Sequence, residues 1–371
     1  MADSRSSSSG SRIELKSDRP PRRGVYLIVA AIVVVVASVS VLVASKSNPS
    51  SIAGPVDTSN LPVGRQAPAL AATGWINSPP LTPARLTGKV VLYDIWTYSC
   101  INCVRTLPKV RAWYDRYRAD GLVVVGVHSP EFDFEKEHAN VEAATRRLDV
   151  TWPVAFDDDH TIWNAFKNQY WPADYVADRT GHIRYTHVGE GDYTNTENVL
   201  RALLGVPASA PRADQNVQAE IGSGKTVNPE TYLDVHHGEV GAKPGLNVYP
   251  AAGTVTAPAV ALEGAWNGAN EKITSGGAGA TILVGVHAQS VNLVLASATG
   301  NPTDAIVTLD GGPVPVKLRG ASIHVDANGR TVVTVNAPDM YRLVLAPDVE
   351  NHVLTMVAEE PGLEAYAFTF G

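Results

Sequence analysis

The chain has 371 residues, of which 44% are hydrophobic, and a formal net charge of -7 at pH 7. This length exceeds one ordinary domain of about 100–200 residues, so more than one folded unit is expected. The acidic balance argues against a nucleic-acid partner. The chain has 2 cysteines, too few and too close together for a disulfide scaffold, and no metal or cofactor site is predicted.

Residues 1–24 form a Ser-, Arg- and Pro-rich tail for which we expect no stable fold. Residues 25–45 carry no charged side chain, and as a helix they are long enough to cross a hydrocarbon core of about 30 Å. Arg19, Arg22 and Arg23 precede this stretch. The positive-inside tendency therefore predicts a single-pass cell-membrane anchor with a cytoplasmic N-terminus and extracytoplasmic globular domains. A cleaved signal peptide is the alternative, and it would also export the chain.

Alternating strand and helix patterns predict an α/β unit over residues 66–206, after a Pro-, Gly- and Ser-rich linker at 46–65. The continuous apolar run Lys89–Trp96 is typical of a central strand that is covered on both faces. The two cysteines follow it, and then a helix that ends at Gly121. The other expected elements are strands at Leu122–Ser129 and Trp152–Phe156, helices at Glu135–Leu148, His160–Phe166 and Asn195–Leu204, and a hairpin that turns at Gly181.

Cys100 and Cys103 form a C-x-x-C pair at the junction of the buried strand and the helix. Free backbone N–H groups and the macrodipole stabilise an anion at a helix N-terminus. Cys100 is therefore the expected nucleophile in its thiolate form. Cys103 lies one turn further along and can resolve a mixed disulfide. This placement predicts thiol–disulfide exchange, with the pair as a redox-active disulfide.

The surroundings of the pair resemble thioredoxin. Asp94 lies six residues before Cys100, where thioredoxins keep a buried acid, and Trp96 matches the aromatic residue beside their site. The resemblance implies that Asp94 takes or gives the proton of Cys103 and that Trp96 contacts substrate, although Trp96 could equally be a core residue. Thioredoxins often place a lysine near this acid on the neighbouring strand, but this chain has Gly126 or a valine there.

Trp171 and Pro172 resemble the loop that carries the cis-proline of thioredoxins. The resemblance implies that Pro172 docks the substrate backbone and that Trp171 contributes to substrate binding. The long stretch between the second strand and Pro172 resembles the inserted helix and strand of the TlpA/ResA-like, membrane-tethered group. Nearby, His128 could neighbour the site, but a capping or solvated role is favoured. Glu131 and Glu135 could line a substrate groove, but a solvated loop and helix start is favoured.

A peroxidase is the alternative within redox chemistry. Thr97, three residues before Cys100, fits the peroxiredoxin pattern, whereas Tyr93 stands where those enzymes have proline. The C-x-x-C pair favours disulfide exchange over peroxide reduction.

Residues 207–227 are a second predicted linker, and residues 228–371 a domain of short β-rich runs. Their alternation predicts an antiparallel, jelly-roll-like β-sandwich. For Trp266 we expect a core or turn role rather than stacking on a sugar. The predicted strands are Ala280–Val286, Ser290–Ser297, Ala305–Gly311, Thr331–Asn336, Tyr341–Ala346, His352–Glu359 and Ala365–Gly371.

This second domain resembles the β-domain of DipZ-type proteins, in which a cytochrome c biogenesis-type membrane electron carrier is fused ahead of a thioredoxin-like domain. Here a single anchor takes the place of that carrier, so the resemblance implies a separate membrane electron carrier as redox partner. Such sandwiches also resemble carbohydrate-binding modules, which implies a possible glycan ligand.

The sequence thus predicts a membrane-anchored, extracytoplasmic oxidoreductase that exchanges disulfides with protein thiols. The alternative from another class is an envelope protein that binds a glycan or a protein through the β-sandwich. The direction of electron flow stays open, and the resemblance favours a reductant of the cytochrome-maturation type.

Overall fold

The computed structural model describes residues 58, 61–214, 226 and 228–371. The predicted tail at 1–24 and the predicted transmembrane helix at 25–45 lie outside these residues. Within the described ranges, no helix combines the length and the apolar character needed to cross a bilayer.

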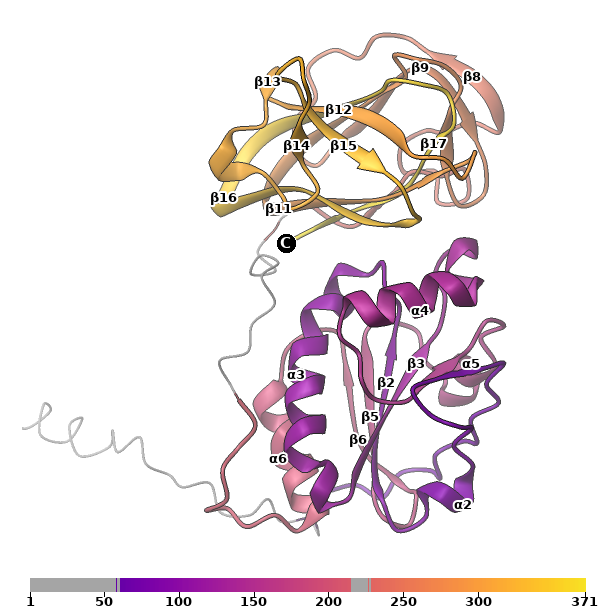
Figure 1. Ribbon diagram of the computed structural model, residues 1–371, viewed down its shortest axis with the longest axis vertical. Coiled ribbons are helices and arrows are strands. Elements are labelled where there is room, and N and C mark those ends of the chain that lie inside the picture. Colours follow the sequence, from indigo (N-terminus) through magenta and orange to yellow (C-terminus); the bar gives the residue numbers. More distant parts are fainter. Residues whose placement is uncertain (1–57, 59–60, 215–225, 227) are drawn as a thin grey trace, which may run out of the picture. The chain divides into compact units, whose positions relative to one another are not determined.

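The first half of the described chain is built on a six-stranded sheet with the strand order β1-β4-β3-β2-β5-β6 (Figure 1). The central strands β2, β3 and β4 run parallel, whereas β5, β6 and β1 pair antiparallel to their neighbours. The strands are β1 (Trp75–Ile76), β2 (Val90–Trp96), β3 (Leu122–His128), β4 (Val154–Phe156), β5 (Ala173–Ala177) and β6 (Ile183–Val188).

Helices pack on both faces of this sheet. Every residue of β2 is buried, and side chains alternate between the faces of a strand. Leu92 and Trp96 join one apolar cluster with residues of α3, α4 and α6, while Tyr93 and Ile95 join another with α5. The predicted thioredoxin-like α/β unit is confirmed. The helices are α2 (Pro83–Leu86), α3 (Ile101–Tyr117), α4 (His138–Arg147), α5 (Thr161–Phe166) and α6 (Tyr193–Leu204).

Two turns follow the sequence closely. Gly121 ends the 3₁₀ turn Arg118–Asp120 that follows α3, with a φ of 105°. Glycine adopts this left-handed conformation without steric cost. Gly181, with a φ of 85°, closes the predicted hairpin between β5 and β6. The helix expected over 135–148 is shorter, because a 3₁₀ turn occupies Asp133–Lys136 and α4 begins only at His138.

The second half is β-rich, as predicted, and its strand pairs are antiparallel. They form one eleven-stranded sheet, in which β9 also pairs with β11. The strands are β7 (Thr231–Tyr232), β8 (Gly245–Tyr249), β9 (Val260–Gly268), β10 (Ile273–Ser275), β11 (Thr281–Ser297), β12 (Thr303–Leu309), β13 (Gly312–Pro313), β14 (His324–Val325), β15 (Thr331–Val335), β16 (Asp339–Ala358) and β17 (Leu363–Phe370).

Four predicted strands are in fact two long ones. The runs at 280–286 and 290–297 belong to β11, and those at 341–346 and 352–359 belong to β16. The ladder between β11 and β16 continues past the polar residues and shifts register at two places, between Ala288 and Ser290 and between Val291 and Asn292. A β-bulge absorbs such a break without reversing the chain. The prediction that the strands end at these polar residues was therefore wrong.

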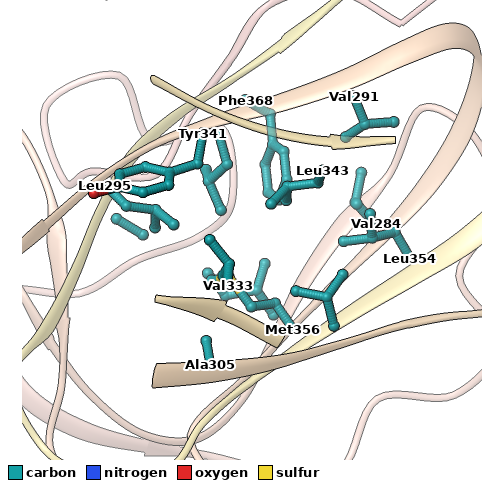
Figure 2. Packing of buried hydrophobic residues seen from close by; sticks show 14 of the residues in the cluster. Val284, Val291, Leu295, Ala305, Val333, Tyr341, Leu343, Leu354, Met356 and Phe368 are labelled. Carbon is teal, nitrogen blue, oxygen red and sulfur yellow. The ribbon is translucent and has the colours of Figure 1, made fainter. Parts of the chain in front are cut away.

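The long strands enclose the core of this half. Figure 2 shows Leu295, Tyr341, Phe368 and Met356 directed into a shared interior. Trp266 is 0% exposed, and its Nε1 donates to the carbonyl of Glu263 at 3.0 Å, so the prediction of a core role is confirmed.

Candidate active site

The cysteine pair lies where β2 ends and α3 begins. Cys100 is the N-cap residue of α3, and its Sγ accepts the backbone N–H of Cys103 at 3.4 Å. That N–H belongs to the first helical turn, where donors have no partner inside the helix. Both cysteines are free thiols. The Sγ atom of Cys100 therefore faces this N–H at the positive end of the helix dipole.

The two sulfurs have different surroundings. Cys100 is 7% exposed and Cys103 is 0% exposed, so the nucleophile predicted from the sequence is the one that a partner reaches first. Burial raises the pKa of the Cys103 thiol; Cys100 and Asp94 raise it further, while a hydrogen bond involving Thr97 lowers it. Cys103 therefore needs a base before it can attack.

Asp94 is the acid that the resemblance assigned to this proton. Its side chain is 1% exposed, and neither carboxyl oxygen has a hydrogen-bond partner. Burial raises the pKa of Asp94 well above its ordinary value, and the charge of Asp174 raises it further. The charge of Asp94 in turn raises the pKa of Cys103. A buried carboxyl with a raised pKa, electrostatically coupled to a buried thiol, is suited to exchange a proton with it.

The structure explains why no lysine stands beside Asp94 on the neighbouring strand. Gly126 is the partner of Asp94 on the neighbouring strand β3. A Cβ atom at Gly126 would lie 2.9 Å from Nε1 of Trp96 and 3.1 Å from Nε1 of Trp152. Two indole rings thus fill the space that a longer side chain would need, and the pKa of Asp94 is set by burial and by another acid.

That other acid, Asp174, was missed by sequence reasoning. Asp174 is the cross-strand partner of Asp94 on β5, and its Oδ1 is buried without a hydrogen-bond partner. Burial raises the pKa of Asp174 to about 7. The only signal in the sequence was its position two residues after Pro172, which has no meaning until the register of β5 against β2 is known.

Pro172 directly precedes β5, the strand that carries Asp174. The Trp171–Pro172 peptide bond is cis, as the resemblance implied, and the next residue, Ala173, pairs with Ile95 near the end of β2. Trp171 is partly exposed; its Nε1 donates to the carbonyl of Ser129 at 3.0 Å. Trp96, by contrast, is 0% exposed, so in this structure it is a core residue with no surface to offer a substrate.

Glu135 is buried, contrary to the expectation that it is solvated. It is 0% exposed, and its Oε1 accepts the N–H of Ser99 at 3.3 Å and the hydroxyl of Ser99 at 2.6 Å. Its Oε2 accepts the N–H groups of Glu131 and Phe132 at 2.6 and 3.1 Å. Because Ser99 directly precedes Cys100, this carboxylate holds the loop that presents the nucleophile.

The substitution Glu135→Gln tests this anchoring role. An amide can present only one acceptor oxygen, so two of the donors lose their partner, and we expect a loss of about 1–3 kcal/mol in the free energy of unfolding. Urea unfolding of the full chain measures it. The matched control is Glu137→Gln on an exposed side chain, expected within about 0.5 kcal/mol of the parent. Equal losses in both variants would contradict the anchoring role.

His128 is also buried rather than solvated. It is 0% exposed, its Nε2 lies 3.3 Å from Oγ1 of Thr97, and its ring stacks on Tyr98 with centroids 5.7 Å apart. Burial lowers the pKa of His128 to about 3, so it is a neutral packing residue beside the cysteine loop at physiological pH.

Residues of the second half also contact this region. Ile101, in the first turn of α3, joins an apolar cluster that includes Phe132, Met340 and Tyr366. The hydroxyl of Tyr232, on β7, donates to the carboxylate of Glu131. These contacts contribute to the low exposure of the loop and helix turn that carry the cysteines, and nothing in the local sequence pattern indicated them.

Two protein families match separate parts of the chain. The AhpC/TSA family matches residues 63–186, and the family described as "Thioredoxin like C-terminal domain" matches residues 228–371. The first match contains the cysteine pair, Asp94 and Pro172, and the second covers the β-rich half.

Individual relatives agree with these matches. Protein DipZ of Mycobacterium bovis is 34% identical over 310 residues, which are 81% of this chain and 42% of DipZ. Thiol-disulfide oxidoreductase YkuV of Bacillus subtilis is 33% identical over 131 residues, 35% of this chain and 87% of YkuV. Thiol-disulfide oxidoreductase ResA of Bacillus cereus is 21% identical over 147 residues, 40% of this chain and 82% of ResA. The chain thus spans about two fifths of the length of DipZ and most of the length of the two smaller enzymes.

Proposed function

The chain belongs to the thioredoxin-like thiol–disulfide oxidoreductases of the redoxin family, and on this premise we propose that it exchanges disulfides with protein thiols outside the cytoplasmic membrane. The observation that carries the proposal is the differently buried pair at the start of α3, with Cys100 on the helix cap and Cys103 inside. Asp94, buried and without a hydrogen-bond partner, supplies the acid–base group.

In the reductive direction, the Cys100 thiolate attacks a substrate disulfide. A bond forms between Cys100 Sγ and one substrate sulfur, and the other substrate sulfur leaves and takes a proton from solvent. Cys103 then gives its proton to Asp94 and attacks Cys100 Sγ, so the protein disulfide forms and the second substrate thiolate leaves. The protein dithiol is oxidised and one substrate disulfide is reduced to two thiols. The oxidative direction is the reverse.

Substrate docking is assigned to the loop at the start of β5. Pro172 and the partly exposed Trp171 stand beside the end of β2, and an extended peptide that lies there can pair through its backbone. The predicted segment 25–45 would hold the protein on the membrane, and a separate membrane electron carrier would return the pair to its working redox state.

The test is an exchange assay with the full chain and a protein disulfide such as insulin, alongside a peroxide assay. Insulin reduction by the dithiol form, or oxidation of a reduced protein by the disulfide form, is the expected result. Consumption of peroxide without disulfide exchange would overturn the proposal in favour of a peroxidase.

The reduction potential of the pair decides the direction. We expect a reductant, with a potential near that of thioredoxin at about −270 mV. The dipeptide between the cysteines, Ile101-Asn102, carries no cation that would stabilise the thiolate further. Equilibration with glutathione buffers and quantification of the two forms by thiol labelling measures the potential. A value near about −120 mV, typical of a strong oxidant, would contradict the reductant assignment.

A further inference from the structure

Four residues lie at one level across the central sheet. Asp94 on β2 pairs with Gly126 on β3 and with Asp174 on β5. Asp174 pairs in turn with His187 on β6. Directly opposite residues of an antiparallel pair point to the same face, with Cβ atoms about 4.5–5.5 Å apart. The register therefore sets two carboxyl groups and an imidazole in a row that begins beside the cysteine pair.

Four polar atoms of this row have no hydrogen-bond partner among the residues that the structure describes. Both carboxyl oxygens of Asp94, Oδ1 of Asp174 and Nε2 of His187 are buried and make no hydrogen bond. Unpaired buried polar groups are costly. A row of several on one face, ending at a buried thiol that must lose a proton, is better explained by proton transfer than by packing.

Solvent exposure increases along the row from Asp94 to His187. Asp94 is 1% exposed, whereas Asp174 and His187 are partly exposed. Burial raises the pKa of Tyr193, at the start of α6, and the charges of Glu190 and Asp174 raise it further. Proton exchange with water is thus open to the outer members of the row and closed to Asp94.

The charged groups that act on Tyr193 together with Asp174 have other partners. Glu190 accepts hydrogen bonds from the guanidinium of Arg105, on α3, at 2.7–3.1 Å, and Lys109 of the same helix lies 5.9 Å from the centre of the Tyr193 ring. Asp192, at the start of α6, accepts the hydroxyl of Tyr185 at 2.7 Å. The partners that face Asp174 on the sheet are therefore Asp94 and His187.

We propose that Asp94 and Asp174 form an electrostatically coupled carboxyl pair that holds one proton between its two groups, and that Asp174, at the side of His187, exchanges protons with solvent. Asp174 touches neither sulfur, so it is a positioning residue that acts through Asp94. The inference rests on the proposed function, because it supplies the route by which the base of the exchange reaction is recharged.

The proton balance is simple. With one proton on the pair and the charge on Asp94, the thiol proton of Cys103 moves to Asp94 as Cys103 attacks the mixed disulfide. The pair then holds two protons, and Asp174 releases one to water, which restores the starting state. Two carboxyl groups on directly paired residues do not both ionise readily. The raised pKa values of both acids, each raised first by burial, agree with a shared proton.

The test is the pH profile of the resolving step in the variant Asp174→Asn. Reduced protein is mixed with an aromatic disulfide that releases a coloured thiol. The first release reports attack by Cys100, and the second reports resolution by Cys103. We expect the midpoint of the second phase to fall by at least about one pH unit, because the charge of Asp174 raises the pKa of Asp94 and the variant lacks that charge.

The control is Asp115→Asn, which removes an exposed carboxylate from α3 and should leave the profile unchanged. A uniform loss of rate in Asp174→Asn with an unmoved midpoint would mean a structural role and overturn the inference. A midpoint that rises would also overturn it, since Asp174 would then not oppose the charge on Asp94.

Asp94→Asn is measured in parallel to separate the two proposals. If it keeps the parent profile, the acid–base role in the proposed function fails; if it alters the profile and Asp174→Asn does not, only the pair fails. Carboxyl ¹³C titration of the unsubstituted chain covers the case in which a variant does not fold. Two signals that move with shared midpoints are expected, and independent titration of Asp94 and Asp174 would contradict the pair.

Discussion

A chain with Cys103→Ser should attack a disulfide once and then stop, held to its substrate by a covalent bond. Cys100 keeps its place on the helix cap, so the first step proceeds. The serine hydroxyl cannot attack the mixed disulfide, so multiple turnover should fall to background. Non-reducing electrophoresis and mass spectrometry of the variant after mixing with a disulfide-containing protein should show the adduct, which dithiothreitol releases.

The matched variant is Cys100→Ser, in which the remaining thiol is 0% exposed and has a raised pKa through burial. It should form no adduct under the same conditions. An adduct of similar yield from Cys100→Ser would reverse the assignment of nucleophile and resolving thiol. Expressed in the native cell, Cys103→Ser should also retain its physiological partner for identification.

Replacing Asp94 with asparagine should slow the chemistry and stabilise the fold. Without the carboxyl group, Cys103 must lose its proton to water, and we expect the resolving step to slow by about a hundredfold, at the lower end of the range for general acid–base catalysis. Rapid-mixing measurement of that step at pH 7 checks the rate. A variant that resolves as fast as the parent would exclude Asp94 as the base.

The stability effect has a defined dependence on pH. The folded-state pKa of Asp94 is raised above the unfolded value, so the folded state binds the proton more tightly. Stability is therefore fully present below about pH 4, the ordinary value for aspartate, and is lost as the pH rises through the folded-state value. Asp94→Asn should flatten this loss, so its melting temperature should exceed that of the parent at pH 8 but not at pH 4. A gain that is the same at both pH values would contradict the ionisation argument.

Both effects come from one cause. An unpaired acid inside a sheet core costs folding free energy, and the same desolvation gives it a pKa suited to exchange a proton with a buried thiol. Functional sites often hold groups of this kind at the expense of stability. Asp94, Asp174 and Cys103 are therefore the places where we expect stability and activity to respond in opposite directions.

Local chemistry was readable from the sequence because it depends on neighbours along the chain. The apolar run of β2, the cysteine spacing and the helix that follows place Cys100 on a helix cap in any compact fold. The resemblance to thioredoxin extended this to Asp94 and to a cis peptide bond before Pro172, and the structure has that bond. The β-rich character of residues 228–371 was readable for the same reason, since alternation is a local property.

Burial of polar residues in loops was not readable. His128 ends β3 and Glu135 lies in the 3₁₀ turn that follows, in a stretch rich in charged residues, and a solvated loop is the ordinary interpretation of such a stretch. In the structure each is 0% exposed, because Ser99 and the backbone of the following loop supply hydrogen-bond donors to Glu135. Those partners come from separate segments, so no window of sequence contains the reason for the burial.

The sequence by itself determined which atoms carry the chemistry, because a thiolate at a helix cap and a resolving thiol one turn later are consequences of short-range geometry. The tertiary structure alone decided what surrounds them. The register of β5 against β2 brings Asp174 opposite Asp94. The packing of Trp96 and Trp152 leaves no room for a side chain at Gly126 of β3. Pairings between distant segments follow from how the whole sheet closes, and a shift of one residue would turn Asp174 to the other face.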